Sequence, residues 1–84
     1  MNAAKLVKMA NDIATFFEAA PAPAAALEGV TAHLSRFWEP RMRRELLAWV
    51  DETGGGELRP LVLEAVKKNR DRLTPRAAGT PGVV

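Results

Sequence analysis

The sequence contains no cysteine, no tyrosine and only one histidine, His33. Disulfides are therefore excluded, and a metal site is disfavoured, because thiolates and imidazoles are the usual ligands of protein zinc sites. No stretch approaches the ~18 apolar residues of a membrane-spanning helix, and the first residues lack a continuous apolar run of signal-peptide length. We therefore expect a cytoplasmic protein that makes no membrane contact, in keeping with the absence of cysteine in a reducing compartment.

The chain is also short, with 84 residues, which suffices for one domain. A domain of this size buries only about 60–65% of its unfolded surface, so its stability margin is small. Because disulfides and metals are disfavoured, we expect a partner chain to supply additional stability. The charges are nearly balanced, with 12 Lys and Arg against 10 Asp and Glu, so we expect no nucleic-acid partner.

Hydrophobic residues recur at the spacing of one helical face in four segments. The predicted helices span residues 3–19, 23–37, 40–52 and 60–72. A proline stands at the start of each of the last three, where its missing N–H has no cost, and three consecutive glycines end the third. The sequence therefore predicts an all-α fold, a small bundle of about four short helices in one domain, 1–73. Residues 74–84 are predicted to form a flexible tail.

Large side chains are densest between residues 33 and 44, His-Leu-Ser-Arg-Phe-Trp-Glu-Pro-Arg-Met-Arg-Arg. Phe37 is expected in the core, whereas Trp38 either fills the core or faces a partner, because tryptophan is enriched at binding hot spots. His33 lies at the edge of an apolar arc, where it either bonds to a carbonyl or contacts a partner. Gly29, within the second helix, either marks a close approach of another helix or has no special role.

Arg43 projects into the apolar arc of the third predicted helix, whereas Arg41 and Arg44 project away from it. A guanidinium there must reach solvent or find carboxylate or carbonyl partners, because an unpaired buried charge is too costly. The intramolecular interpretation pairs Arg43 with one of three acids, Glu18, Glu39 or Glu64. The alternative pairs it with an acidic residue of another protein.

The sequence offers no catalytic constellation. Ser35 lies close to His33 in the sequence but no triad follows from this, and the three glycines lack the Lys-Ser/Thr of a phosphate-binding loop. We expect a binding module without enzymatic activity. DNA binding by the corner around Pro40 is a weaker alternative, because the third helix has few polar base-reading residues. The candidate partner-facing residues are His33, Arg36, Trp38, Arg41, Met42 and Arg43.

Three blocks of the sequence resemble the delta subunit of soluble NAD-dependent, molybdenum-containing formate dehydrogenases. They are Lys5-Leu-Val-Lys-Met-Ala-Asn-Asp-Ile13 with Phe16-Phe17, the segment 33–44, and Leu58-Arg-Pro-Leu-Val-Leu-Glu-Ala-Val66. The blocks occur in the same order as in that family and together span about residues 4–66. The Pro-Ala-rich segment 19–26 and the residues after Leu73 lie outside the resemblance.

The resemblance implies a non-catalytic accessory subunit of a bacterial cytoplasmic complex. In that family the alpha subunit carries the molybdenum cofactor and iron–sulfur clusters, and the beta and gamma subunits carry FMN and further clusters and pass electrons to NAD. The delta subunit carries no cofactor. We therefore expect residues 33–44 to dock on the alpha subunit and stabilise or assemble the complex. A transient chaperone for insertion of the molybdenum cofactor is the alternative.

Overall fold

The computed structural model describes residues 2–75, and within this range the chain forms helices and no strand. The helices are α1 (Ala3–Phe17), α2 (Pro23–Phe37), α3 (Pro40–Thr53), α4 (Pro60–Lys68) and α5 (Arg70–Leu73). The predicted all-α fold is confirmed. The predicted helix 60–72 is wrong in one respect, because Asn69 divides it into α4 and α5. Most of the predicted tail, residues 76–84, lies outside the described residues.

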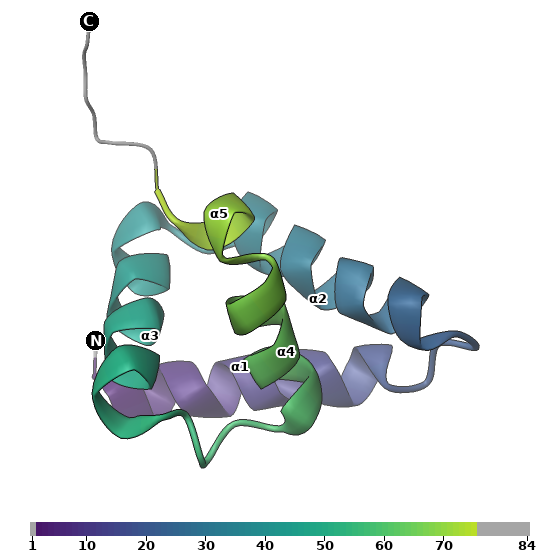
Figure 1. Ribbon diagram of the computed structural model, residues 1–84, viewed down its shortest axis with the longest axis horizontal. Coiled ribbons are helices and arrows are strands. Elements are labelled where there is room, and N and C mark those ends of the chain that lie inside the picture. The colour runs from purple at the N-terminus through teal and green to yellow at the C-terminus, as the bar shows by residue number, and fades with distance from the viewer. Residues whose placement is uncertain (1, 76–84) are drawn as a thin grey trace, which may run out of the picture.

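Helices α1, α2 and α3 form a frame that α4 covers (Figure 1). Helix α2 packs against α1, α3 packs against α1, and α4 lies across α1 and α2. The short α5 packs against α2 and α4. No helix in residues 2–75 is long and apolar enough to span a membrane.

Local sequence signals set most helix ends. The Asn2 side chain caps α1 by accepting a hydrogen bond from the Lys5 N–H at 2.9 Å. A proline opens each of α2, α3 and α4 at the first turn, where the missing N–H has no helical partner to lose. Helix α3 ends at Gly54, whose φ of 83° is the left-handed conformation that glycine adopts without strain.

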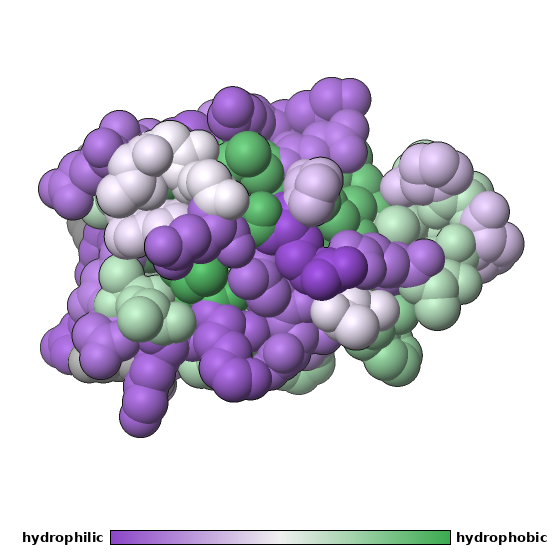
Figure 2. All heavy atoms as spheres, turned by 90° about the horizontal axis from the view of Figure 1, so that it is seen from below, coloured by the Kyte–Doolittle hydropathy of each residue, from purple (hydrophilic) through white to green (hydrophobic). Residues whose placement is uncertain are grey.

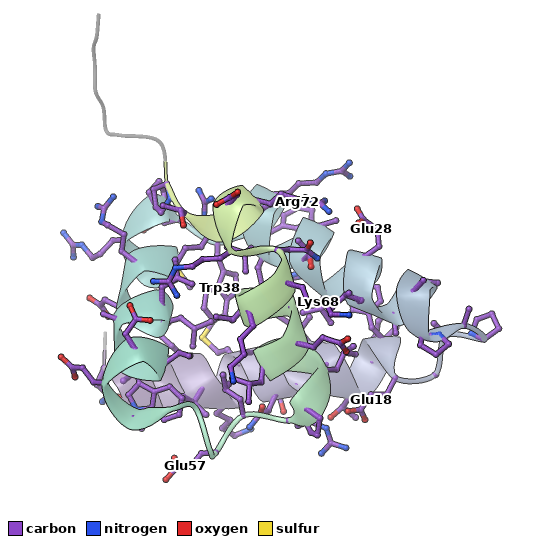
Figure 3. The ribbon with its side chains drawn as sticks, in the orientation of Figure 1. Glu18, Glu28, Trp38, Glu57, Lys68 and Arg72 are labelled. Atoms are coloured by element: carbon purple, nitrogen blue, oxygen red, sulfur yellow. The ribbon has the colours of Figure 1, made fainter. Side chains whose placement is uncertain are left out.

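The core is built from aliphatic side chains of all five helices and from Trp38, which is only 5% exposed. Trp38 follows the last residue of α2 with an extended backbone and points into the interior of the bundle (Figure 3). The sequence left open whether Trp38 faces the core or a partner, and in this chain it fills the core.

Phe37 corrects a second expectation, because it is 71% exposed and does not belong to the core. The reason is steric. Trp38 leaves the helix and fills the interior at this end of α2, so that the preceding ring stays at the surface. Phe16 of α1 is likewise 73% exposed, because it lies at the edge of the apolar arc of that helix.

Candidate functional site

Arg43 stabilises the elbow, residues 38–39, which joins α2 to α3. Its Nε donates to the Trp38 carbonyl at 3.2 Å, and its Nη1 donates to the Leu73 carbonyl at 3.4 Å. The first bond closes the elbow on itself, and the second ties it to the end of α5. The half-buried guanidinium is therefore satisfied by carbonyls within the chain.

The proposed carboxylate partners of Arg43 were wrong. Glu18 binds Arg59 instead, with Arg59 Nε donating at 2.7 Å, and Glu64 forms an i,i+4 pair with Lys68 at 3.1 Å. Both are surface pairs on other elements, and Glu39 offers Arg43 only its backbone carbonyl, which accepts from the Arg43 N–H at 3.1 Å. The periodicity of α3 correctly predicted that Arg43 lies partly buried on the apolar side of the helix. It could not predict the hydrogen-bond partners, because backbone carbonyls at helix ends have no signature in a sequence.

The six candidate residues divide by exposure. The surface members are Arg36 and Arg41, which form no ion pair among residues 2–75. His33, Met42 and Arg43 are half-buried, and Trp38 is buried. Their role as partner contacts stays a prediction, and the most exposed of the six are Arg36 and Arg41.

A row of aromatic rings crosses the surface between α1 and α2. We call Phe16, Phe17, His33 and Phe37 the aromatic strip. Successive ring centroids are 5.0, 6.4 and 5.0 Å apart, within the range of interacting aromatic pairs. The strip contains all three phenylalanines and the one histidine of the chain. Its two ends, Phe16 and Phe37, are the most exposed large hydrophobic side chains among the described residues.

Two open hollows adjoin the strip. The first, of about 330 Å³, lies along α1 and is lined by Asp12, Ile13 and the first three rings of the strip. The second, of about 250 Å³, lies along α2 beside Gly29, Ala32, Arg36 and the last three rings. Phe17 and His33 line both hollows and so form the ridge between them. Seen from below, the end of the molecule where α1 leads into α2 shows pale green and pale purple residues side by side, and the deeper green of more hydrophobic residues lies nearer the middle (Figure 2).

Gly29 makes this surface possible. A Cβ at this position would lie 2.3 Å from Cδ1 of Phe17, closer than real Cβ atoms approach. The close approach of another helix, left open by the sequence, is therefore present, and it is the Phe17 ring of α1 that makes it. Because Gly29 has no side chain, the Phe17 ring can pack directly against α2, beside His33 in the strip.

The sequence left two interpretations of His33 open, a hydrogen bond to a carbonyl or a contact with a partner. The Nδ1 of His33 is buried and has no hydrogen-bond partner among residues 2–75, so the bond to a carbonyl is absent at this atom. Leaving a buried polar atom unsatisfied costs about 1–3 kcal/mol.

Three arginines in the second half of the chain form ion pairs with carboxylates. Arg59 binds Glu18, Arg72 binds Glu28 (Figure 3) and Arg70 binds Asp51, each through two hydrogen bonds. The hydrogen bonds from Arg59 and Arg72 hold the pKa of the Glu18 and Glu28 carboxyls below the usual value of 4.5. These pairs tie α1 to α4, α2 to α5 and α3 to α5.

No three His, Asp or Glu side chains within residues 2–75 are grouped so that they could hold a metal ion. The aromatic strip, by contrast, has the features of a surface that binds another molecule. It offers exposed aromatic rings, two hollows and the Arg36 guanidinium beside the second hollow. Sequence reasoning named His33 and Arg36 but missed Phe16, Phe17 and Phe37. The available signal was the spacing of Gly29, His33 and Phe37, which places them in one row on a helix.

The family model of the NADH-dependent formate dehydrogenase delta subunit FdsD matches residues 5–66. The chain belongs to this family. Comparisons with the curated proteins and with the solved structures found no match. The range shared with other FdsD delta subunits covers the elbow and the aromatic strip and ends within α4, so that α5 lies outside it. The resemblance found in the sequence is thereby confirmed.

Proposed function

We propose that this delta subunit docks on the catalytic alpha subunit of an NADH-dependent formate dehydrogenase and stabilises it, without catalysing a reaction itself. The observation that supports docking is the aromatic strip, whose ends, Phe16 and Phe37, are 73% and 71% exposed. Family membership makes the chain an accessory subunit of a formate dehydrogenase complex. The choice of the alpha subunit rests on the resemblance.

The exposed rings have an energetic cost that a partner would remove. Fully burying a phenylalanine side chain contributes about 1.5–3 kcal/mol, so covering the exposed parts of both ends would contribute roughly 2–4 kcal/mol. A contiguous apolar patch on a small domain marks an interaction surface. The chain gains from its partner the burial that its own short helices do not supply.

The same proposal assigns the cofactors to other subunits. The molybdenum cofactor and iron–sulfur clusters belong to the alpha subunit, and FMN, further clusters and the NAD site belong to the beta and gamma subunits. The delta subunit contributes surface and helix packing. The cytoplasmic location stays a prediction.

The test is the stoichiometry of the mature complex. The tagged chain is co-expressed with the other subunits, and the active complex is analysed by native mass spectrometry. We expect one delta chain for each alpha chain, retained when beta and gamma are omitted and lost when alpha is omitted. If the delta chain were found only on alpha subunit that lacks its cofactors, and were absent from the mature active complex, the result would contradict the proposal and favour the transient chaperone.

A further inference from the structure

Helices α2 and α3 diverge from the elbow and have little direct contact with each other. Each of them packs against α1 instead. The short α5 lies between them close to the elbow (Figure 1), and it packs against α2. Helix α5 therefore adds a link between two helices that are otherwise related mainly through α1 and the elbow.

Two ion pairs attach α5 to both of these helices. Arg72 binds the Glu28 carboxylate of α2 through hydrogen bonds of 2.7 and 2.8 Å. Arg70 binds the Asp51 carboxylate of α3 through hydrogen bonds of 3.0 and 2.8 Å. Pairs with two parallel bonds fix direction as well as distance. The two arginines stand two residues apart, about 200° around a helix, so one short helix reaches partners on opposite sides.

The two ends of α5 are attached as well. At its end, the Leu73 side chain is 1% exposed and belongs to the core, and the Leu73 carbonyl accepts from Arg43 Nη1 at 3.4 Å. At its start, Asn69 donates to the Thr31 hydroxyl at 3.0 Å. Asn69 has a φ of −115° and a ψ of 33°, which interrupts the helix and makes α5 a separate unit from α4.

The ion pairs make this attachment sensitive to salt. Their four side chains are between 43% and 60% exposed, and the Debye length falls from about 10 Å to about 3 Å between about 0.1 and about 1 M salt. Four residues are too few for a helix that persists alone, since isolated helices shorter than about 12–15 residues are marginal in water. Helix α5 therefore depends on its anchors, and two of them weaken as salt is added.

We infer that α5 is a strap that restricts the angle between α2 and α3, and that it opens as a unit when its two ion pairs are weakened. Opening removes the Leu73 carbonyl from Arg43, so that the guanidinium keeps only its bond to the Trp38 carbonyl. Because Arg36 lies on α2 and Arg41 on α3, the strap also limits how far these two candidate residues can move apart. The inference concerns the free chain and does not depend on the docking proposed above.

Hydrogen exchange of the full chain, followed residue by residue by NMR, tests the opening. The Thr74 N–H donates to the Arg70 carbonyl at 2.8 Å and so reports on the strap. Relative to the amides of α1, we expect Thr74 exchange to accelerate about twofold to thirtyfold when NaCl is raised from about 0.02 to about 1 M, the range for losing two exposed ion pairs.

Variants that leave α5 itself unchanged separate the strap from general fraying of a chain end. The double variant Glu28→Gln with Asp51→Asn should accelerate Thr74 exchange by a similar factor at low salt and abolish its salt dependence. The control is Glu18→Gln, which breaks the equally two-pronged pair with Arg59 between α1 and α4; it should change Thr74 exchange by less than about twofold. Unchanged Thr74 exchange in the double variant, or an equal acceleration in the control, would overturn the inference.

The angle between the helices is measured by electron paramagnetic resonance. Because the chain has no cysteine, nitroxide labels can be attached through Ala25→Cys on α2 and Glu52→Cys on α3, both exposed. We expect a broader distribution of label-to-label distances when Glu28→Gln and Asp51→Asn are added, and an unchanged one when Glu18→Gln is added. Equal widths in all three proteins would show that the strap does not restrict the angle and would overturn the inference.

Discussion

Replacing Trp38 with alanine should destabilise the chain itself, whether or not a partner is present. The side chain is 5% exposed and belongs to the aliphatic core. Phe or Trp to Ala substitutions in a core cost about 3–5 kcal/mol. A domain of 84 residues has a stability of roughly 4–13 kcal/mol, at about 0.05–0.15 kcal/mol per residue. The substitution therefore removes a large part of the total, and at the lower limit all of it.

The neighbouring residue supplies a matched control. Phe37 is adjacent in sequence and also aromatic, but it is 71% exposed, so Phe37→Ala should change stability by only about 0.5 kcal/mol. The free energy of unfolding is measured for both variants by urea titration followed by circular dichroism. Trp38→Ala should also lower Tm by at least about 12 °C, at about 4–8 °C for each kcal/mol.

The opposite order of effects would refute the assignment of the two rings. If Phe37→Ala cost more than Trp38→Ala, the elbow would have the reverse orientation, with Phe37 inside. A cost below about 1 kcal/mol for Trp38→Ala, together with lost binding to the alpha subunit, would make Trp38 an interface residue. Because Trp38→Ala unfolds the elbow in our account, loss of binding in this variant alone says nothing about contact.

Three further predictions concern the glycines and one ion pair. Replacing a glycine inside a helix by alanine usually stabilises a protein by about 1 kcal/mol. Gly29→Ala should not do so, because the new Cβ displaces the Phe17 ring. A full gain of this size in a urea titration would contradict the prediction. Gly54→Ala should cost about 1 kcal/mol, because Gly54 has a φ of 83°, whereas Gly56→Ala, with normal φ and open space around it, should leave Tm nearly unchanged; equal effects at both positions would refute the cap. The Glu28 carboxyl has a lower pKa in the folded state than in the unfolded state, so its ionised form stabilises the fold at pH values above the unfolded-state pKa. This stabilisation is lost as the pH falls through the folded-state pKa, which lies below 4.5. Glu28→Gln should therefore make stability less sensitive to pH between about 6 and 3, and an unchanged pH profile would contradict the pairing.

The helices and their ends could be read from the sequence because the signals that set them are local. Proline at the first turn, a capping asparagine and a glycine with positive φ act on the residues beside them, and the periodic apolar positions act within one helix. The exception is Asn69, where the apolar pattern predicted a continuing helix. Its side chain donates to the buried Thr31 hydroxyl at 3.0 Å, a contact between distant parts of the chain that no local pattern reveals.

The candidate site was found only in part. The sequence identified the elbow, His33 and Arg36 because charged and aromatic residues are concentrated there. It placed Phe37 inside and left Trp38 undecided, because both positions fall within the apolar arc of the second predicted helix. Which of the two turns inward depends on the backbone at Trp38 and on the space left by α4 and α5.

The sequence by itself determined an all-α chain of short helices, a cysteine-free core and membership in the FdsD delta-subunit family. Tertiary structure decided which surface remains open. The aromatic strip joins rings from α1 and α2 that lie 16 or more residues apart in the chain, and Gly29 allows them to meet. Exposure depends on what packs against each side chain in space, and that is settled only when all the helices are in place.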